Sequence, residues 1–375
     1  MQWASTVSRR ADLVGAVEEA ATGVATALGG AAPDLTLAFV SSHHAAHYAA
    51  VPGLVQAALG GGALLGCSAG GVIGGGHEVE DGPGLSLTAA VLPGVTVSPL
   101  QLEEPAQPAI EGEAPQLVVL ADPFSFDVEA FVHTVDAASP GAVVVGGLAS
   151  GARRPGENAL FAGEQVRRGG LVGVALGGDV VLETIVAQGC RPIGDPMFVT
   201  RCERNVVYEL DGRPAVLALQ LVLERLPKED RALVRHSLFL GVVMQQQRQE
   251  YRQGDFLIRN VLGVEPKQAA LVVGASLQEG QVVQFHLRDA QTSADDLIHL
   301  LARYQQRPSG SLLFSCLGRG RHLYGRPDHD TDVFRAALGD VPLGGFFCNG
   351  EIGPVQGRTF LHGYTSAFGL FRPRH

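Results

Sequence analysis

The stretch FFCNGEIGPV, residues 346–355, places one carboxylate in an otherwise uncharged run of aromatic, small and apolar residues. A carboxylate in a dry cavity is costly unless it is paired. Glu351 is therefore either solvated at a turn or held as an acceptor for a cation such as an ammonium group. Asn349-Gly350 before it is a turn signal, and a type I′ turn with an exposed Glu351 is the simpler alternative.

Two arginines in CLGRGRHLYG (316–325) could supply the opposite charge. Arg319 and Arg321 lie in a glycine-rich loop after a predicted buried strand, and loops at strand ends are where open α/β sheets bind ligands. A guanidinium can hold a carboxylate through two hydrogen bonds. Residues two apart face one way in an extended loop. An arginine together with Glu351 would suit a zwitterion such as an amino acid; two solvated arginines are the alternative.

Cysteines in the same regions could act as nucleophiles. Cys67 in GCSAGG (66–71) precedes a glycine-rich turn whose backbone N–H groups could stabilise an oxyanion, and Cys316 opens the arginine loop. The local sequence places no histidine to act as base for Cys67, and a small buried cysteine is the common case. An enzyme using Cys67 or Cys316 is therefore the alternative to a binding protein. As walls of a binding cleft we expect Gly66, Cys67, Ser68, Cys316 and Cys348.

Arg191 in QGCRPIG (188–194) either lines a cleft between two halves or belongs to an inter-domain turn. Metal ligation is not favoured. His43 and His47 have a compatible spacing but no third ligand nearby, and Asp330 is better explained as a helix N-cap. The sequence contains no CxxC pair, no P-loop and no clean GxGxxG, so we expect neither a metal nor a cofactor.

Strand and helix patterns alternate along the chain. Buried strands are predicted at 35–40, 63–67, 116–123, 142–147 and 311–316, and helices at 10–28, 50–59, 127–138 and 331–339. Alternating apolar residues predict antiparallel strands at 85–92 and 94–102. This mixture predicts an α/β fold with mixed, partly antiparallel sheets flanked by helices.

One order of elements occurs twice: strand, loop, helix, strand and glycine turn. LAFVSS, QAALG and LLGCSAGGVIG form the first copy, and LLFSC, RAALG and LGGFFCNGEIG the second. Gly71-Val72-Ile73-Gly74 aligns with Gly350-Glu351-Ile352-Gly353, so Glu351 takes the place of Val72 and the turn itself does not require it. We predict an internal duplication with two related lobes, packed as a layered sandwich, and domains at 1–195 and 196–375.

The composition limits the class of protein. The 375 residues are 46% hydrophobic with a net charge of −10 and no basic cluster, which argues against a nucleic-acid partner. Residues 51–76 carry no charge, but they have too many glycines and too few large apolar residues for a membrane span. The N-terminus lacks the apolar core of a signal peptide. We therefore expect no membrane partner, and reduced cysteines in a cytoplasmic protein.

Several of these motifs resemble the FIST family, named for F-box and intracellular signal transduction. They are GCSAGG (66–71), QGCRPIG (188–194), FHLRDA (285–290), LLFSCLGRG (312–320), FFCNGEIGPV and FLHGYT (360–365). The resemblance covers nearly the whole chain, and its C-terminal signature is the specific part. The first glycine turn departs from the family, which commonly has a serine-threonine pair and an acidic residue there. Here no hydroxyl follows Ser68 and no acid is present.

The resemblance implies a cytoplasmic sensory module that binds a small ligand, with amino acids suggested, and acts through a signalling-protein partner. In the family such modules stand alone or are fused to signalling domains, and this chain resembles the stand-alone form. We expect Arg319, Arg321, Asn349, Gly350 and Glu351 to bind a small polar ligand in a cleft of glycine-rich strand-end loops. The alternatives are the cysteine enzyme and a protein-interaction scaffold without a ligand.

Overall fold

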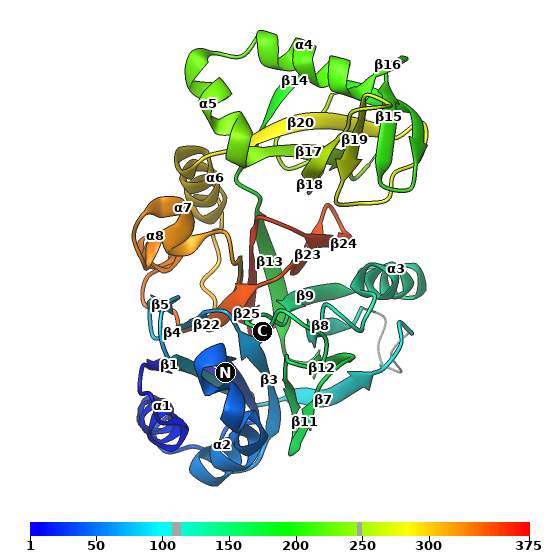
Figure 1. The fold of residues 1–375 in the computed structure, drawn as a ribbon. Helices are drawn as coiled ribbons and strands as arrows, with labels where there is room; N and C mark the ends of the chain where they lie inside the picture. The colour runs from blue at the N-terminus through cyan, green and yellow to red at the C-terminus, as the bar shows by residue number, and fades with distance from the viewer. Residues whose placement is uncertain (107–113, 246–249) are drawn as a thin grey trace. The chain divides into compact units, whose positions relative to one another are not determined.

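The computed structural model describes residues 1–106, 114–245 and 250–375. These residues divide into two compact units (Figure 1). The first unit joins Met1–Val186 to Ile298–His375, and the second unit is Ala187–Leu297. In sequence, the second unit is therefore an insertion within the first.

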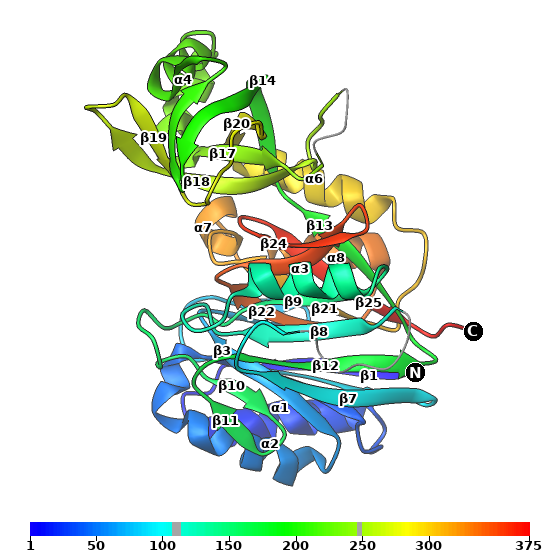
Figure 2. The same ribbon diagram turned by 90° about the vertical axis from the view of Figure 1, so that its right-hand side faces the viewer.

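Within the described residues, the first unit holds three six-stranded sheets that share one plan (Figures 1 and 2). Each has an edge strand, a second strand, a parallel pair and a hairpin, in that order. Sheet one is β1 (Gln2–Ser8), β6 (Leu85–Val91), β2 (Leu35–Ser41), β3 (Ala63–Ala69), β10 (Leu160–Ala162) and β11 (Gln165–Arg167). Sheet two is β7 (Val95–Leu102), β12 (Leu171–Gly178), β8 (Gln116–Ala121), β9 (Val143–Leu148), β23 (Glu351–Val355) and β24 (Arg358–His362). Sheet three is β13 (Val181–Ala187), β25 (Ser366–Arg372), β21 (Gly310–Cys316), β22 (Leu343–Cys348), β4 (Val72–Gly74) and β5 (His77–Val79).

The parallel pairs are β2 with β3, β8 with β9, and β21 with β22, and the strands on either side of each pair run antiparallel to it. A parallel pair needs a crossover connection, which is usually helical. Each crossover here contains a helix: α2 (Val51–Leu59) after the 3-10 helix η1 (Ser42–Ala50), α3 (Val128–Ala138), and α8 (His329–Leu338) after the short α7 (Gly320–Tyr324). Figure 2 shows α3 lying across β8 and β9.

The hairpins are exchanged between the repeats. The hairpin β4–β5 follows β3 in the chain but pairs with β22 in sheet three. The hairpin β23–β24 follows β22 and pairs with β9 in sheet two, while β10–β11 follows β9 and pairs with β3 in sheet one. Each repeat therefore completes the sheet of another, and the repeated unit occurs three times.

One glycine marks the same position in each repeat. Gly66, Gly146 and Gly345 lie opposite Ala38, Val119 and Leu313 of the neighbouring parallel strand. A Cβ added at these glycines would lie 2.0, 1.8 and 1.9 Å from the carbonyl oxygens of those three residues, respectively. No side chain fits at such a separation, so the close approach of the strands requires glycine three times.

Apolar side chains of all three sheets meet in one central core. Phe39 of sheet one stacks on Phe346 of sheet three at 4.8 Å between ring centroids, and Val118 and Leu120 of sheet two belong to the same cluster. The outer faces pack on helices. Sheet one packs against α1 (Leu13–Ala27) and α2, and sheet two against α3. Both faces of β2 and β8 are buried, which explains their continuous apolar sequences.

The second unit is built on a seven-stranded sheet. Its order is β14 (Cys190–Glu203), β20 (Val282–Arg288), β17 (Leu238–Val243), β18 (Phe256–Glu265), β19 (Ala270–Val273), β15 (Val206–Leu210) and β16 (Arg213–Pro214). Its helices are α4 (Ala215–Glu224) and α5 (Lys228–Ser237), and α6 (Ala290–Ala302) leads back to the first unit. The inserted unit lies in the chain between the edge strand β13 and the parallel pair β21–β22. The first repeat has α1 at the equivalent place.

The predicted α/β fold with mixed sheets and flanking helices is confirmed. The prediction of an internal duplication identified two of the three copies of the repeated unit and missed the copy at β8–β9. QGCRPIG directly follows the boundary between the two units at Val186/Ala187, and β14 begins within it at Cys190 and pairs with β20.

Candidate functional site

The strand-end loops of the three repeats are joined by one hydroxyl group. Ser150, which follows β9, accepts a hydrogen bond from the Gly70 N–H at 2.8 Å and donates to the Phe347 carbonyl at 2.5 Å. Gly70 follows β3, and Phe347 lies at the end of β22. Ser150 is fully buried. The carboxyl ends of the three parallel pairs therefore meet at this side chain.

Glu351 is fully buried at the start of β23, where it pairs with Gly147 and His362. Its Oε2 accepts hydrogen bonds from the Thr365 N–H at 3.1 Å and the Thr365 hydroxyl at 2.9 Å. Neither Asn349 nor Gly350 has the positive φ that a type I′ turn requires. The alternative of an exposed turn residue is therefore wrong for Glu351.

The threefold repeat supplies two internal comparisons for Glu351. Val72 pairs with Phe346 and Leu160 pairs with Cys67, just as Glu351 pairs with Gly147. Each of these three partners directly follows the close-approach glycine of its strand. Val72 and Leu160 are fully buried in the central core. The fold accepts an aliphatic side chain here twice, so packing does not require a carboxylate.

Arg319 is fully buried and pairs with Asp330, with Nε–Oδ2 at 2.9 Å and Nη2–Oδ1 at 3.2 Å. Nη2 also donates to the Tyr324 hydroxyl at 2.6 Å. Burial alone would lower the pKa of Arg319, but the negative charge of Asp330 outweighs it and the pKa is raised. Burial likewise opposes ionisation of Asp330, and Arg319 holds the pKa of that carboxyl well below its usual value.

Arg321 does not face the same way as Arg319. The two residues span the start of α7, so they are not in an extended loop. The Arg321 side chain is 57% exposed and pairs with Asp81 at 2.8 Å, while its N–H donates to Glu80. Asp330 is not an N-cap either, because α8 starts one residue before it.

Cys316 and Cys348 end the two parallel strands β21 and β22 in register. The Cys316 Sγ accepts a hydrogen bond from the Gly318 N–H at 3.4 Å. Cys348 and Cys67 are both fully buried, and burial raises the pKa of each thiol well above its ordinary value. A nucleophile needs a lowered pKa. The geometry therefore gives no support to Cys67 as a nucleophile.

Ser68, predicted as a cleft wall, is an internal link. Its hydroxyl donates to the Asn158 Oδ1 at 3.2 Å and accepts from the Ala159 N–H at 3.1 Å. Asn158 in turn donates to the buried Asp122 at 2.9 Å. Its neighbour Gly66 is the close-approach glycine of β3. Both residues thus hold the first repeat together at its strand end.

Arg191 belongs to the second unit, where it pairs with Asp230 at 2.5 Å and Asp289 at 3.3 Å. Asn349 is exposed, and its side chain donates to the Ala149 carbonyl at 3.2 Å. The structure thus brings Cys316, Arg319, Asn349, Gly350 and Glu351 into one repeat of the first unit. It places Arg191 in the second unit and leaves the Arg321 side chain exposed.

Thr365 and Ser366 connect this cluster, and the sequence patterns did not single them out. Thr365 donates to Glu351, and its carbonyl accepts from the Cys316 N–H at 3.0 Å. Ser366 donates to Asp330 at 2.7 Å. The sequence did contain a signal for these two residues. They are adjacent hydroxyl residues after the Gly-Tyr turn, and a hydroxyl group can donate a hydrogen bond to a buried carboxylate.

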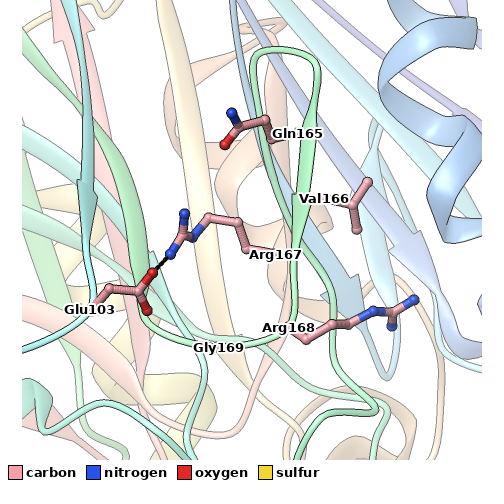
Figure 3. Close-up of a pocket in the computed structure, with 6 residues that line it drawn as sticks. All are labelled: Glu103, Gln165, Val166, Arg167, Arg168 and Gly169. Carbon is pink, nitrogen blue, oxygen red and sulfur yellow. Dashed lines mark ion pairs between the residues drawn. The ribbon is translucent and has the colours of Figure 1, made fainter.

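An open pocket of about 490 Å³ lies elsewhere, at the β10–β11 hairpin. Its lining residues are Glu103, Gln165, Val166, Arg167, Arg168 and Gly169. Figure 3 shows the ion pair between Arg167 and Glu103, with Arg168 directed away from it. None of the predicted site residues lines this pocket.

Comparison with protein-family models identifies the family of this chain. The FIST N domain model matches residues 34–213, and the FIST C domain model matches residues 218–354. The chain belongs to the FIST family. The interval between the two FIST matches, residues 214–217, falls inside the second unit, at the end of β16 and the start of α4. The predicted domain boundary at 195/196 stays a prediction.

Relatives support the assignment along the whole length. An uncharacterized protein of Mycobacterium tuberculosis (strain CDC 1551 / Oshkosh) is 37% identical over 97% of this chain and 98% of its own length. An uncharacterized protein of Mycobacterium bovis is 37% identical over 95% of each chain. An F-box/LRR-repeat protein of Arabidopsis thaliana is 27% identical over 46% of this chain and 36% of its own length.

FIST domains are associated with sensing in signal transduction and are not a known enzyme family. In the three described stretches of the chain, no helix is long and apolar enough to cross a membrane.

Proposed function

We propose that this FIST protein is a cytoplasmic sensory module whose first unit binds a small polar ligand at the carboxyl ends of its parallel strand pairs. The observation that carries the proposal is the meeting of the three strand-end loops at the Ser150 hydroxyl. Ligands of α/β sheets bind outside the carboxyl ends of the strands.

Glu351 supports a ligand with a cationic group. Burial of a carboxylate costs free energy that an aliphatic side chain does not, and the fold accepts Val72 and Leu160 at the equivalent positions. The presence of the buried Glu351 carboxylate is therefore best explained by a role other than packing. The natural partner of a carboxylate beside the strand ends is an ammonium group.

An amino acid is the ligand class that fits best, because opposite charges are held by neighbouring residues. Thr365 donates to Glu351, and the next residue, Ser366, donates to Asp330, which holds Arg319. A ligand with an ammonium group for Glu351 and a carboxylate for Arg319 Nη1, which has no hydrogen-bond partner among the described residues, matches this arrangement. A dicarboxylate matches only the guanidinium, and a neutral sugar matches neither.

The test is a thermal-shift screen of the full chain against free amino acids, dicarboxylates and small sugars. A ligand at about 100 times its Kd stabilises the folded state by about 2.7 kcal/mol, which raises the melting temperature of a chain of this size by about 3 °C. We expect a shift for an amino acid that is lost in Glu351→Gln, which keeps the side-chain size and an acceptor for Thr365. Glu164→Gln, at an exposed site in the β10–β11 hairpin, should retain it.

Equal shifts in wild type and Glu351→Gln would contradict the role of Glu351, and no shift across the panel would contradict the ligand. We also propose that the occupied module acts on a signalling protein, because FIST domains are associated with signal transduction. A pull-down from cell extract with and without the amino acid that shifts the melting temperature tests this step. The captured protein should depend on the amino acid and should be lost with Glu351→Gln.

A further inference from the structure

Two cysteines lie side by side at the strand ends of the third repeat. Cys316 and Cys348 are direct partners in the parallel pair β21–β22. In-register residues of parallel strands place their side chains on the same face, and neighbouring strands lie about 4.8 Å apart. A disulfide spans Cα separations of about 4.4–6.8 Å. The backbone positions are therefore compatible with a bond between the two sulfur atoms.

The two thiols differ in their surroundings. Cys316 is half-buried, whereas Cys348 is fully buried. Burial raises the pKa of Cys348, and the neighbouring Glu351, Cys67 and Cys316 raise it further. Cys348 therefore stays a protonated thiol at neutral pH, and Cys316 is the member of the pair that a small oxidant reaches first.

Positive charge and an N–H donor lie beside Cys316. Its Sγ accepts a hydrogen bond from the Gly318 N–H at 3.4 Å. Arg319 lies three residues after Cys316, and its backbone N–H donates to the Cys316 carbonyl at 2.9 Å. Among the described residues, Arg319 Nη1 is buried without a hydrogen-bond partner. A thiolate at Cys316 would meet this charge.

We propose that Cys316 and Cys348 form a peroxide-sensitive thiol pair that closes to a disulfide across the ends of β21 and β22. The Cys316 thiolate attacks one oxygen of hydrogen peroxide, which breaks the O–O bond and leaves a sulfenic acid and a hydroxide ion. The hydroxide takes the proton of the Cys348 thiol, and the resulting thiolate attacks the Cys316 sulfur. The S–O bond breaks and releases a second hydroxide, which takes up the proton that Cys316 lost on ionisation. In sum, two thiols and one peroxide give one disulfide and two waters.

This inference does not depend on the proposed function, because no ligand takes part in it. A disulfide at the half-buried Cys316 would be accessible to a reductant, and accessible disulfides are the readily reduced ones. The pair would return to the thiol form under cytoplasmic reductants. The thiol pair would make the chain respond to an oxidant as well as to a small ligand, at the strand ends where Asn349 and Glu351 lie.

The experiment is peptide mapping of the full chain after brief treatment with hydrogen peroxide, without reduction. We expect loss of two hydrogen atoms from the intact mass and a tryptic peptide pair joined through Cys316 and Cys348. Dithiothreitol should reverse both changes. A link between Cys67 and Cys348, a link between two chains, or further oxidation of Cys316 without any link would overturn the proposal.

Variants separate the two steps. Cys348→Ser should allow the sulfenic acid at Cys316 to be trapped by dimedone but should form no link, and Cys316→Ser should abolish both. Cys202→Ser is the matched control, since Cys202 is also half-buried and its pKa is raised, by burial first and by Glu279. It should behave like wild type. Dimedone labelling that is faster at Cys202 than at Cys316 would contradict the assignment, and wild-type mapping decides the outcome even where a variant does not fold.

Discussion

Arg319 and Asp330 form an ion pair from which water is excluded, with side-chain exposures of 0% and 2%. Removing one partner of a buried pair leaves an uncompensated charge, whereas an exposed pair contributes little. Arg319→Met should therefore lower the free energy of unfolding by about 3–5 kcal/mol. Arg321→Met should change it by less than about 1 kcal/mol. Urea unfolding of both variants measures the difference.

The double variant Arg319→Met with Asp330→Asn is the control for this interpretation. It removes both charges, so it should recover part of the stability that Arg319→Met loses. Equal effects of Arg319→Met and Arg321→Met would show that the buried pair is not what holds this loop.

Glu78 should make the chain less stable as pH rises. It is 2% exposed, and burial followed by the charge of Asp330 raises its pKa from 4.5 to about 8. Between these values the unfolded chain loses the proton and the folded chain keeps it, so the folded state binds more protons and stability falls with pH. Asp330, whose pKa is lowered, loses its contribution only below its unfolded pKa of 3.8, outside this window.

Glu78→Gln tests this directly, because the amide oxygen can still accept from the Thr331 N–H as the carboxylate does at 2.9 Å. The variant should be more stable than wild type at pH 8, and the difference should shrink toward pH 5. Urea midpoints at both pH values suffice. A midpoint difference between Glu78→Gln and wild type that does not grow from pH 5 to pH 8 would contradict the burial of a protonated Glu78.

The close-approach glycines should not tolerate a methyl group. Gly66→Ala and Gly146→Ala place a Cβ about 2 Å from a backbone carbonyl oxygen. The backbone must move to accommodate the added methyl group. Overpacking of this kind costs about 1–3 kcal/mol or more. Gly53→Ala is the matched control. Gly53 lies in α2 with open space around it, so alanine should stabilise the chain by up to about 1 kcal/mol. Thermal unfolding of the three variants measures this, and similar losses for all would argue against the threefold register.

The sequence predicted the strands and helices well because their apolar patterns are local. It did not predict which strands pair. The segments at 85–92 and 94–102 are both strands, yet β6 lies in sheet one and β7 in sheet two. The hairpin β4–β5 pairs with β22, far away in the chain, and no local pattern encodes such an exchange.

The site was predictable in part. The charge of Glu351 in an apolar run singled it out. Its burial depends on the hydrogen bond from Thr365 and on the pairing of β23 with β9. The Asn349-Gly350 sequence reveals neither contact. The opposite orientations of Arg319 and Arg321 follow from one short helix turn in a glycine-rich segment. The second repeat, at β8–β9, lacks the Ala-Ala-Leu-Gly motif that aligned the other two copies.

Hydrogen–deuterium exchange of the full chain, with and without a mixture of the common L-amino acids, measures whether a ligand protects the strand ends. We expect slower exchange at the strand-end segments 66–71, 148–151 and 348–351, with 187–297 unchanged. Unchanged exchange in all three segments, or protection confined to other parts of the chain, would contradict a ligand site at the meeting point of the three repeats.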